Sequence, residues 1–478
     1  MSDFINVTNE VAKATLADPT SAALAAGKSL LADGIVYESD GVNWDAVTTG
    51  DFTSETVPTD LTAGQLVNID GKVAMSDSED LLNISVDESL IRHTQTRLNN
   101  FYLTTASSAT SGTTRNIAIA MEARFNRVRA LYANNTDVVT NLGPIAVTVR
   151  SAIAGIAESR NNDATPLPVT VAGATTVAMA ARPSATVPRF YWTDWANISS
   201  VARPAGNTHP YLIWRDFAAG SQTMTVTSND SQSWSGLSRE KWTTGTGTGN
   251  FVDTNYATYN GGQNANQTYA VGFQADAPDG CINIANVGDS VFAGYGAGVS
   301  IFGNSWFYRS VVGISTDKLP VNHINMGWTG QTSDKFLARF KALVADLDLS
   351  IAIFQTYSTN DGSPTAALIS AAKGRVADFL ATCTTNRVVP VLWTPLVSSL
   401  WTPEQKALMA AYRDEVRSYK NVHIIDAASV LIDPATNDFI AGVSDDSVHL
   451  NETGIALATP VAQAVVRKAL KNGSRVTL

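Results

Sequence analysis

The feature that most constrains the fold is a change of pattern near residue 280. After it, short apolar runs alternate with helical stretches, as in "CINIANV", "SDKFLARFKALVADL", "SIAIFQTYS" and "SPTAALISAAKGRVADFLATC". Apolar strands that alternate with helices are typical of a parallel sheet covered on both faces. Residues 279–478 are therefore predicted to form a doubly wound α/β domain.

Two regions of different pattern precede this domain. Residues 1–88 hold short strand-like runs between Gly and Asp turns, which predict a small β-rich module for attachment or oligomerisation. Residues 89–278 hold many short runs rich in β-branched and aromatic residues, which predict a β-sandwich or jelly-roll-like accessory domain. The segment "ADAPDG", residues 275–280, has the Pro, Asp and Gly of a linker. We therefore expect three domains.

Composition excludes several classes of partner. The net charge of -10 argues against nucleic acid, because a phosphate backbone requires a basic surface. We find no apolar run of about 18 residues and no signal peptide at the start, so membrane insertion is not expected. The two cysteines, Cys281 and Cys383, are expected to be buried free thiols, although one disulfide between them stays open. No cluster has metal-ligand spacing, and no cofactor is expected.

Five segments stand where the predicted strands end, the edge at which doubly wound domains carry functional residues. They are Gly288–Ser290, Asn325–Thr332, Ser358–Asp361, Trp393–Pro395 and Asp446–His449. The glycines at 294, 296 and 298 do not make G-x-G-x-x-G, because position 299 is Val, so a nucleotide-binding loop is disfavoured. The G-x-S-x-G elbow of ordinary α/β-hydrolases is also absent, because Phe292 follows Ser290 by two.

Nucleophilic catalysis fits these segments better. Ser290 follows a strand, and a serine nucleophile needs an imidazole base that a third group orients. His449 and Asp446 have a spacing that lets the carboxylate bind one ring nitrogen while the other faces the serine. Asp445 is a weaker rival, because Asp446 has the better spacing to His449.

Acyl transfer also needs donors where negative charge develops on the carbonyl oxygen. Gly330 permits close backbone approach, so its amide is a candidate, and Asn360 offers a side-chain amide from the next strand end. Together with the amide of Ser290, they form the predicted oxyanion hole.

The segments "GDS", "NMGWTGQT", "STND" and "DSVH" resemble the four sequence blocks of the SGNH hydrolase superfamily, also called GDSL-type esterases. The resemblance covers residues 280–478. It implies an SGNH hydrolase fold, a Ser290, Asp446 and His449 triad, and an oxyanion hole completed by Gly330 and Asn360.

Two positions depart from the usual blocks. Ser358 stands where the third block usually has glycine, and Val291 where many members have leucine. Neither departure removes a catalytic group, but Ser358 could change how Asn360 is presented.

Aromatic residues give a further hypothesis. The segment "RFYWTDWANI" carries Trp192 and Trp195, whose flat faces could stack on sugar rings, and Trp328 lies in the second block. All three are candidate substrate-binding residues. The alternative is that such aromatic residues fill the core of the sandwich, which is the commoner arrangement.

These observations predict a serine esterase. The accessory β domain suggests O-acetyl groups of a surface polysaccharide as substrate. Some bacteriophage tail spikes and fibres look like this arrangement, which implies a homotrimer in the tail of a virion, attached through residues 1–88 and acting at the host cell surface. Two alternatives stay open: a lipid esterase or thioesterase, and a non-catalytic glycan-binding adhesin.

Overall fold

The fold is seen in a computed structural model. It describes residues 3–4, 28–32, 35–39, 44–46, 51–52, 66–69, 72–75, 86–98, 103–107, 113–134, 145–152, 167–176, 179–180, 189–201, 211–218, 223–227, 245–248, 269–296, 305–312, 314–315 and 320–472. The chain divides into two compact units, Met1–Val86 and Asp87–Leu478. All sites discussed below lie in the second unit.

The described part of the first unit consists of short strands. One sheet has the order β1-β2-β3-β4 and the other the order β5-β6-β7. The strands are β1 (Asp3–Phe4), β2 (Lys28–Ala32), β3 (Ile35–Ser39), β4 (Trp44–Ala46), β5 (Asp51–Phe52), β6 (Leu66–Ile69) and β7 (Lys72–Met75). The attachment role of residues 1–88 stays a prediction.

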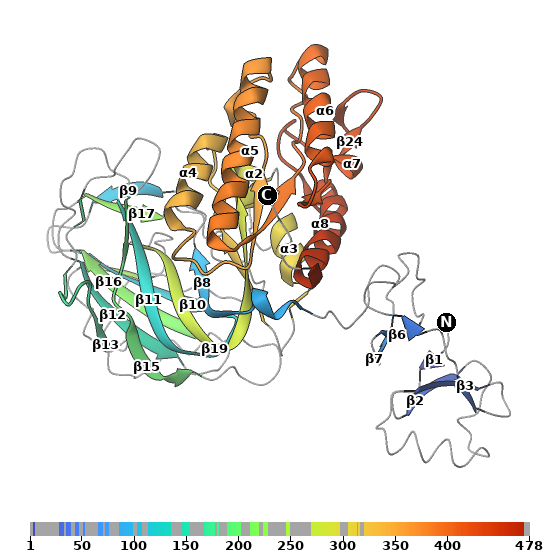
Figure 1. The fold of residues 1–478 in the computed structure, drawn as a ribbon. Coiled ribbons are helices and arrows are strands. Elements are labelled where there is room, and N and C mark those ends of the chain that lie inside the picture. Colours follow the sequence, from blue (N-terminus) through green and yellow to red (C-terminus); the bar gives the residue numbers. More distant parts are fainter. Residues whose placement is uncertain are drawn as a thin grey trace. The chain divides into compact units, whose positions relative to one another are not determined.

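Five parallel strands form the sheet that carries the candidate site (Figure 1), in the order β20-β19-β21-β22-β23. They are β19 (Ala270–Val287), β20 (Val321–Asn325), β21 (Ile351–Gln355), β22 (Val389–Trp393) and β23 (His423–Ile425). Every residue of β20, β21 and β22 is buried, as expected for strands covered on both faces. Counted from β19, the order is 2-1-3-4-5, a doubly wound arrangement with its switch point between β19 and β21. The α/β sheet predicted for the C-terminal region is confirmed.

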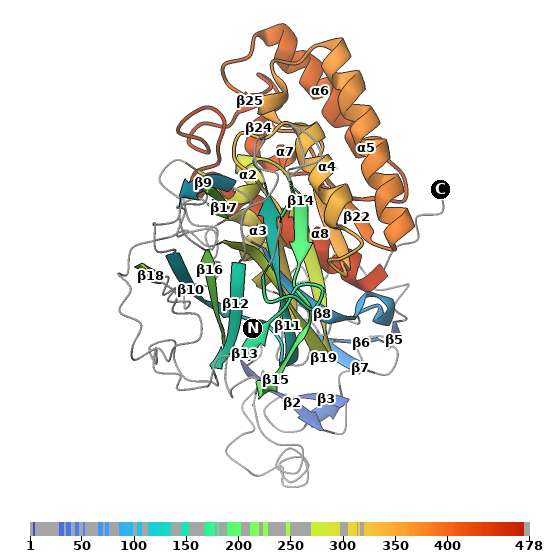
Figure 2. The same cartoon turned by 90° about the vertical axis from the view of Figure 1, so that its left-hand side faces the viewer.

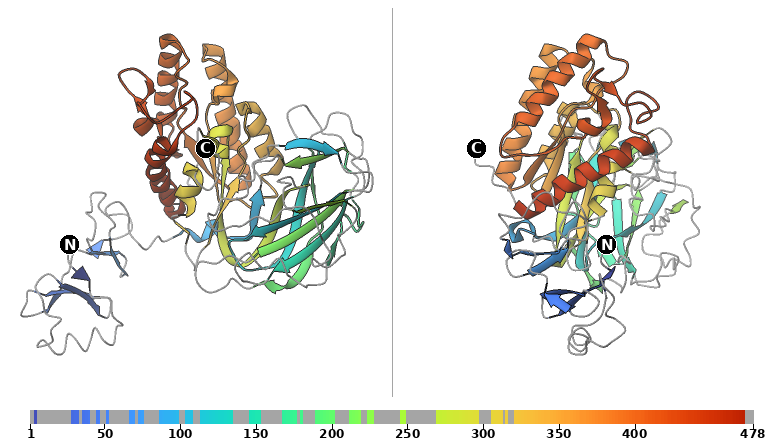
Figure 3. Two further views of the ribbon diagram at one scale, coloured as in Figure 1. Left: turned by 180° about the vertical axis from the view of Figure 1, so that it is seen from behind. Right: turned by 90° about the vertical axis from the view of Figure 1, so that its right-hand side faces the viewer.

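Helices cover both faces of this sheet (Figure 1 and Figure 3): α4 and α5 lie on one face, α3 and α8 on the other. The helices are α3 (Trp306–Val312), α4 (Ser333–Leu343), α5 (Ala366–Asn386), α6 (Pro403–Ser418), α7 (Ala428–Leu431) and α8 (Glu452–Asn472). Their start signals are local. For example, the Thr402 hydroxyl accepts from the Gln405 amide and the Gln405 side chain accepts from the Thr402 amide, a capping box that begins α6.

Strand β19 belongs to two sheets. Its first part pairs antiparallel with β8 (Arg92–Leu98) and β11 (Phe125–Asn134), as Figure 2 shows. Its last part pairs with β20 and β21. The linker predicted at residues 275–280 is therefore wrong. Pro278 is exposed and Gly280 has φ +86° where the pairing register with β8 shifts inside the continuous strand. Pro and Gly occur at such irregularities as well as in linkers.

The remaining described strands form antiparallel pairs beside β19. A five-stranded sheet has the order β13-β12-β16-β10-β18, β14 and β15 pair with β11, and β9 pairs with β17. These strands are β9 (Leu103–Ser107), β10 (Thr113–Ala120), β12 (Ile145–Ala152), β13 (Leu167–Val169), β14 (Arg189–Trp192), β15 (Ala196–Val201), β16 (Tyr211–Ala218), β17 (Thr223–Thr227) and β18 (Gly245–Thr248). Trp214 of β16 meets Phe273 of β19 edge to face in a core that Tyr132 of β11 shares. Closure of residues 89–278 into a sandwich stays a prediction.

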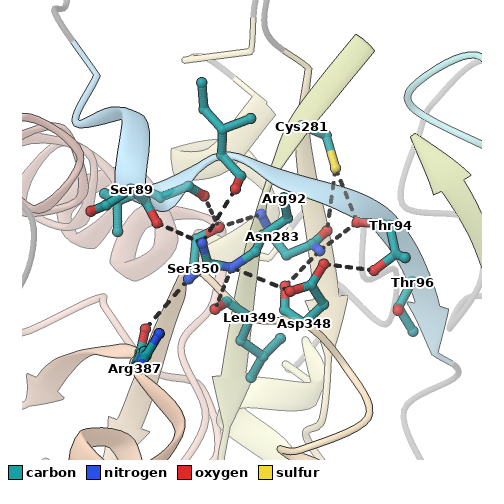
Figure 4. A network of polar contacts seen from close by, with 12 residues as sticks. Ser89, Arg92, Thr94, Thr96, Cys281, Asn283, Asp348, Leu349, Ser350 and Arg387 are labelled. Atoms are coloured by element: carbon teal, nitrogen blue, oxygen red, sulfur yellow. Dashed lines mark hydrogen bonds and ion pairs between the residues drawn. The ribbon is translucent and has the colours of Figure 1, made fainter. Parts of the chain in front are cut away.

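A polar network joins β8 to the amino ends of the parallel strands (Figure 4). We call Ser89, Arg92, Thr94, Cys281, Asn283, Asp348 and Ser350 the amino-end network. Asn283 Nδ2 donates to the carbonyls of Thr94 (2.7 Å) and Asp348 (2.9 Å), and Arg92 Nε donates to the carbonyl of Leu349 (3.0 Å). Because most acceptors are backbone carbonyls, this network fixes the junction of the two sheets.

Candidate active site

Ser290 lies in the turn after β19 and begins the short helix α2 (Ser290–Ala293). The turn needs glycine at 288, because a Cβ there would lie 2.5 Å from the Gln355 side chain and from the Phe292 ring. Asp289 caps the helix by accepting a hydrogen bond from the Val291 amide (2.9 Å). Tight packing therefore fixes the backbone that presents the Ser290 hydroxyl.

His449 and Asp446 reach Ser290 from the loop before α8. Ser290 Oγ lies 2.7 Å from His449 Nε2, and His449 Nδ1 lies 2.6 Å from Asp446 Oδ2. The other carboxylate oxygen of Asp446 accepts from the backbone amides of Val448 (3.0 Å) and His449 (2.7 Å). The three predicted residues are thus brought together in one hydrogen-bonded chain.

The electrostatics of Asp446 suit the orienting role. Partial burial raises the pKa of its carboxyl, but the hydrogen bonds from the His449 ring and from the two backbone amides outweigh burial and lower the pKa overall. Asp446 is therefore ionised at neutral pH and favours the His449 tautomer whose Nδ1 carries the proton. That leaves Nε2 free to accept the proton of the Ser290 hydroxyl.

Two of the three predicted oxyanion donors, Gly330 and Asn360, lie on adjoining loops. Asn360 is exposed in the 3-10 turn η4 (Thr359–Asp361) after β21, and its Nδ2 donates to the carbonyl of Gln331 (3.2 Å). Gly330 has φ +75° with open space where a Cβ would stand. Gly327, its rival in the same block, instead packs under α2, where a Cβ would lie 2.3 Å from the Ala293 amide nitrogen. This favours Gly330 as the functional glycine.

Gln355 and Ser358 form a polar layer that the sequence motifs did not assign. Gln355 Nε2 (3.0 Å) and Ser358 Oγ (2.5 Å) both donate to Asp289 Oδ2. Burial raises the pKa of the Asp289 carboxyl, although these hydrogen bonds oppose the rise. Position was the only available signal, because Gln355 ends β21, the strand next to β19, and Ser358 follows it in the same loop.

The three candidate substrate-binding tryptophans lie in different surroundings. Arg129 stacks on the rings of both Trp192 (4.3 Å) and Trp195 (4.8 Å). Trp192 Nε1 also donates to Asp346, which precedes β21 and so lies at the amino ends of the parallel strands. The structure therefore does not bring Trp192 to the triad. Trp328 is 8% exposed and packs over the buried Arg339 guanidinium.

Other groups that could have competed for function are buried. His323 contacts Arg97 inside the sheet junction. Cys281 and Cys383 are both buried free thiols. In the described ranges, no three His, Cys, Asp or Glu side chains are placed to hold a metal ion. None of the helices in that same part of the chain combines the length and hydropathy that a bilayer span requires.

Comparison with known proteins gives a consistent result for this region. Residues 287–457 match the GDSL-like Lipase/Acylhydrolase family. No curated protein matches the chain.

Similar solved structures include three enzymes of related description. A member of the lipolytic protein G-D-S-L family from Veillonella parvula is 18% identical over 41% of this chain and 100% of that chain, with a TM-score of 0.32. The lipase/acylhydrolase from Enterococcus faecalis is 18% identical over 40% of this chain and 97% of that chain, with a TM-score of 0.32. The psychrotrophic esterase EstA from Pseudoalteromonas sp. is 17% identical over 40% of this chain and 99% of that chain, with a TM-score of 0.31. Residues 287–457, which hold the strand ends and loops described above, form a hydrolase domain of the GDSL/SGNH type.

Proposed function

We propose that the protein is a serine esterase that removes O-acetyl groups from a surface polysaccharide. The observation that carries the chemistry is the hydrogen-bonded chain from Ser290 through His449 to Asp446, with distances of 2.7 Å and 2.6 Å. Such a chain lets an imidazole take the proton of a serine hydroxyl while a carboxylate stabilises the imidazolium.

The reaction follows in two halves. Ser290 Oγ attacks the ester carbonyl carbon and its proton passes to His449 Nε2, which then protonates the departing sugar hydroxyl as the acyl–oxygen bond breaks. Water next gives a proton to His449 and attacks the acyl-enzyme, and acetate leaves as Ser290 regains its proton. The amides of Ser290 and Gly330 and the side chain of Asn360 are the proposed donors to the carbonyl oxygen in both halves.

The exposure of the site supports a bulky substrate. The Asp446 side chain is 39% exposed and that of His449 is 16% exposed, while Asn360 is also at the surface. An acetyl group carried on a polymer can reach such a site without the polymer entering a closed cavity.

A second candidate is the hydrolysis of longer acyl chains. Two exposed apolar side chains favour it: Tyr295, whose ring meets the His449 ring edge to face at 4.8 Å, and Leu400, which is 81% exposed. Leu400 follows Ser399, whose amide donates to the carbonyl of Ser447 in the triad loop (3.1 Å). Apolar surface beside the nucleophile would bind an acyl chain.

The test compares p-nitrophenyl acetate with a long-chain homologue and with O-acetylated polysaccharide. We expect acetate release by the parent protein, and loss of release in Ser290→Ala and His449→Ala. Faster turnover of the long-chain ester would favour the second candidate. Glycan binding without hydrolysis, unchanged in Ser290→Ala, would favour a binding protein in place of an enzyme.

We also propose that the chain is a homotrimer attached through residues 1–88 to the tail of a virion. The support is the order of its regions, a β-rich start followed by strands and then the hydrolase domain. A trimer mass in solution, lost when residues 1–88 are removed, is expected; a monomer would contradict it.

A further inference from the structure

We infer that Ser358 is a positioning residue that fixes the orientation of the Asn360 side-chain amide. The inference rests on the proposed esterase function. Ser358 is fully buried and stands where the resembled sequence block usually has glycine, which has no hydroxyl.

The hydroxyl of Ser358 has two acceptors, Asp289 Oδ2 at 2.5 Å and the Gln331 carbonyl at 3.0 Å. An ionised carboxylate is the stronger acceptor, so the single hydroxyl proton points to Asp289 when that residue is ionised. The two lone pairs of Ser358 Oγ then accept from the backbone N and the Nδ2 of Asn360, both at 3.1 Å. Ser358 thereby ties the buried carboxylate of the nucleophile turn to both nitrogens of Asn360.

Two acceptors hold Asn360 Nδ2, namely Ser358 Oγ at 3.1 Å and the Gln331 carbonyl at 3.2 Å. These two acceptors are themselves 3.0 Å apart, so they subtend about 60° at the nitrogen. Both therefore lie on one side of Nδ2, and together they hold the Asn360 amide in place.

These contacts fix the amide plane of Asn360 and therefore the direction of its N–H bonds. A donor that is already oriented needs no reorganisation when charge develops, and this makes it effective in the transition state. We therefore expect Ser358 to act on kcat through Asn360, with little effect on KM.

The experiment is a double-mutant cycle on acetate ester hydrolysis with Ser358→Ala, Asn360→Ala and the double variant. We expect Asn360→Ala to lower kcat about a hundredfold, Ser358→Ala about tenfold with KM within about twofold, and the double variant to match Asn360→Ala alone. Thr359→Ala is the matched control, because it also removes a hydroxyl from this turn. The Thr359 hydroxyl has no hydrogen-bond partner among the described residues. We expect this variant to leave kcat unchanged. Losses that multiply in the double variant would overturn the inference.

A second measurement does not depend on turnover. In amide NMR spectra of the full chain, Ser358→Ala should shift the Nδ2 proton signals of Asn360 and speed their exchange with solvent. An unchanged Asn360 signal would overturn the positioning role. If the parent protein hydrolyses no ester, the proposed function fails, while this spectrum still decides whether Ser358 orients Asn360.

Discussion

The two ends of the parallel sheet carry similar polar residues and use them in opposite ways. In the amino-end network, Asn283 and Arg92 donate mainly to backbone carbonyls, and Asn283 is fully buried. At the carboxyl ends, the Ser290 hydroxyl bonds the ring of His449, and the ring lies partly exposed. Polar groups saturated by backbone stabilise a fold, whereas a hydroxyl whose partner is a titratable side chain at the surface can do chemistry.

The largest expected effect comes from Asp446→Asn at the carboxyl ends. The amide cannot hold the His449 tautomer that accepts the Ser290 proton, so we expect kcat to fall by about 10³–10⁴ with little loss of stability. Initial rates and a thermal melt of the same preparation check this. A variant with near-parental kcat would show that the carboxyl ends of the strands do not carry the catalytic hydrogen bonds.

Asn283→Ala tests the opposite end. It removes the donor to the part-buried carbonyls of Thr94 and Asp348, of which Thr94 keeps the Cys281 thiol as a second donor, so we expect a loss of about 3 kcal/mol in the free energy of unfolding. Urea denaturation measures the loss. The kcat of the folded fraction should stay within about twofold of the parent, and a selective fall in kcat at unchanged stability would break the comparison.

A pH series sharpens the comparison through two carboxyl groups near the nucleophile. Burial raises the pKa of Asp289 in the folded protein, so its contribution to stability falls as pH rises from the ordinary carboxyl pKa to the raised one. The contribution of Asp446 to stability depends on pH in the opposite direction, because its pKa is lowered in the folded protein. That contribution is present above the pKa of the unfolded chain and is lost as pH falls through the pKa of the folded protein. We expect the urea midpoint to fall less steeply in Asp289→Asn than in the parent protein as pH is raised from about 3 to about 7, the range in which carboxyl groups titrate. Parallel curves for parent and variant would contradict the assignment.

The smallest effect concerns Cys281 in the amino-end network. Burial raises the pKa of its thiol, which donates to the Thr94 carbonyl at 3.2 Å. We expect no reaction with a thiol reagent in the folded protein near pH 8, and reaction of both cysteines after unfolding. Cys281→Ala should cost about 1 kcal/mol and leave kcat unchanged. Rapid labelling of the native protein would show that this end of the sheet is open.

Local patterns predicted the catalytic half of the molecule well. Short apolar runs such as β21 are buried at every residue, and their ends carry residues whose roles depend on spacing within one loop, as with Asp446 and His449. The linker prediction failed because the pairing of β19 with β8 joins segments more than 170 residues apart, which no local pattern records. The stacking of Arg129 between Trp192 and Trp195 and the tie from Ser358 to Asp289 are nonlocal in the same sense.

The most direct test of the account is covalent labelling with a fluorophosphonate, followed by intact mass and peptide mapping. Such a reagent reacts with a serine that a neighbouring imidazole activates. The account predicts one adduct per chain, located on Ser290, and labelling that is at least about a hundredfold slower in His449→Ala. No adduct, or an adduct on another residue, would contradict the assignment of Ser290 as the nucleophile.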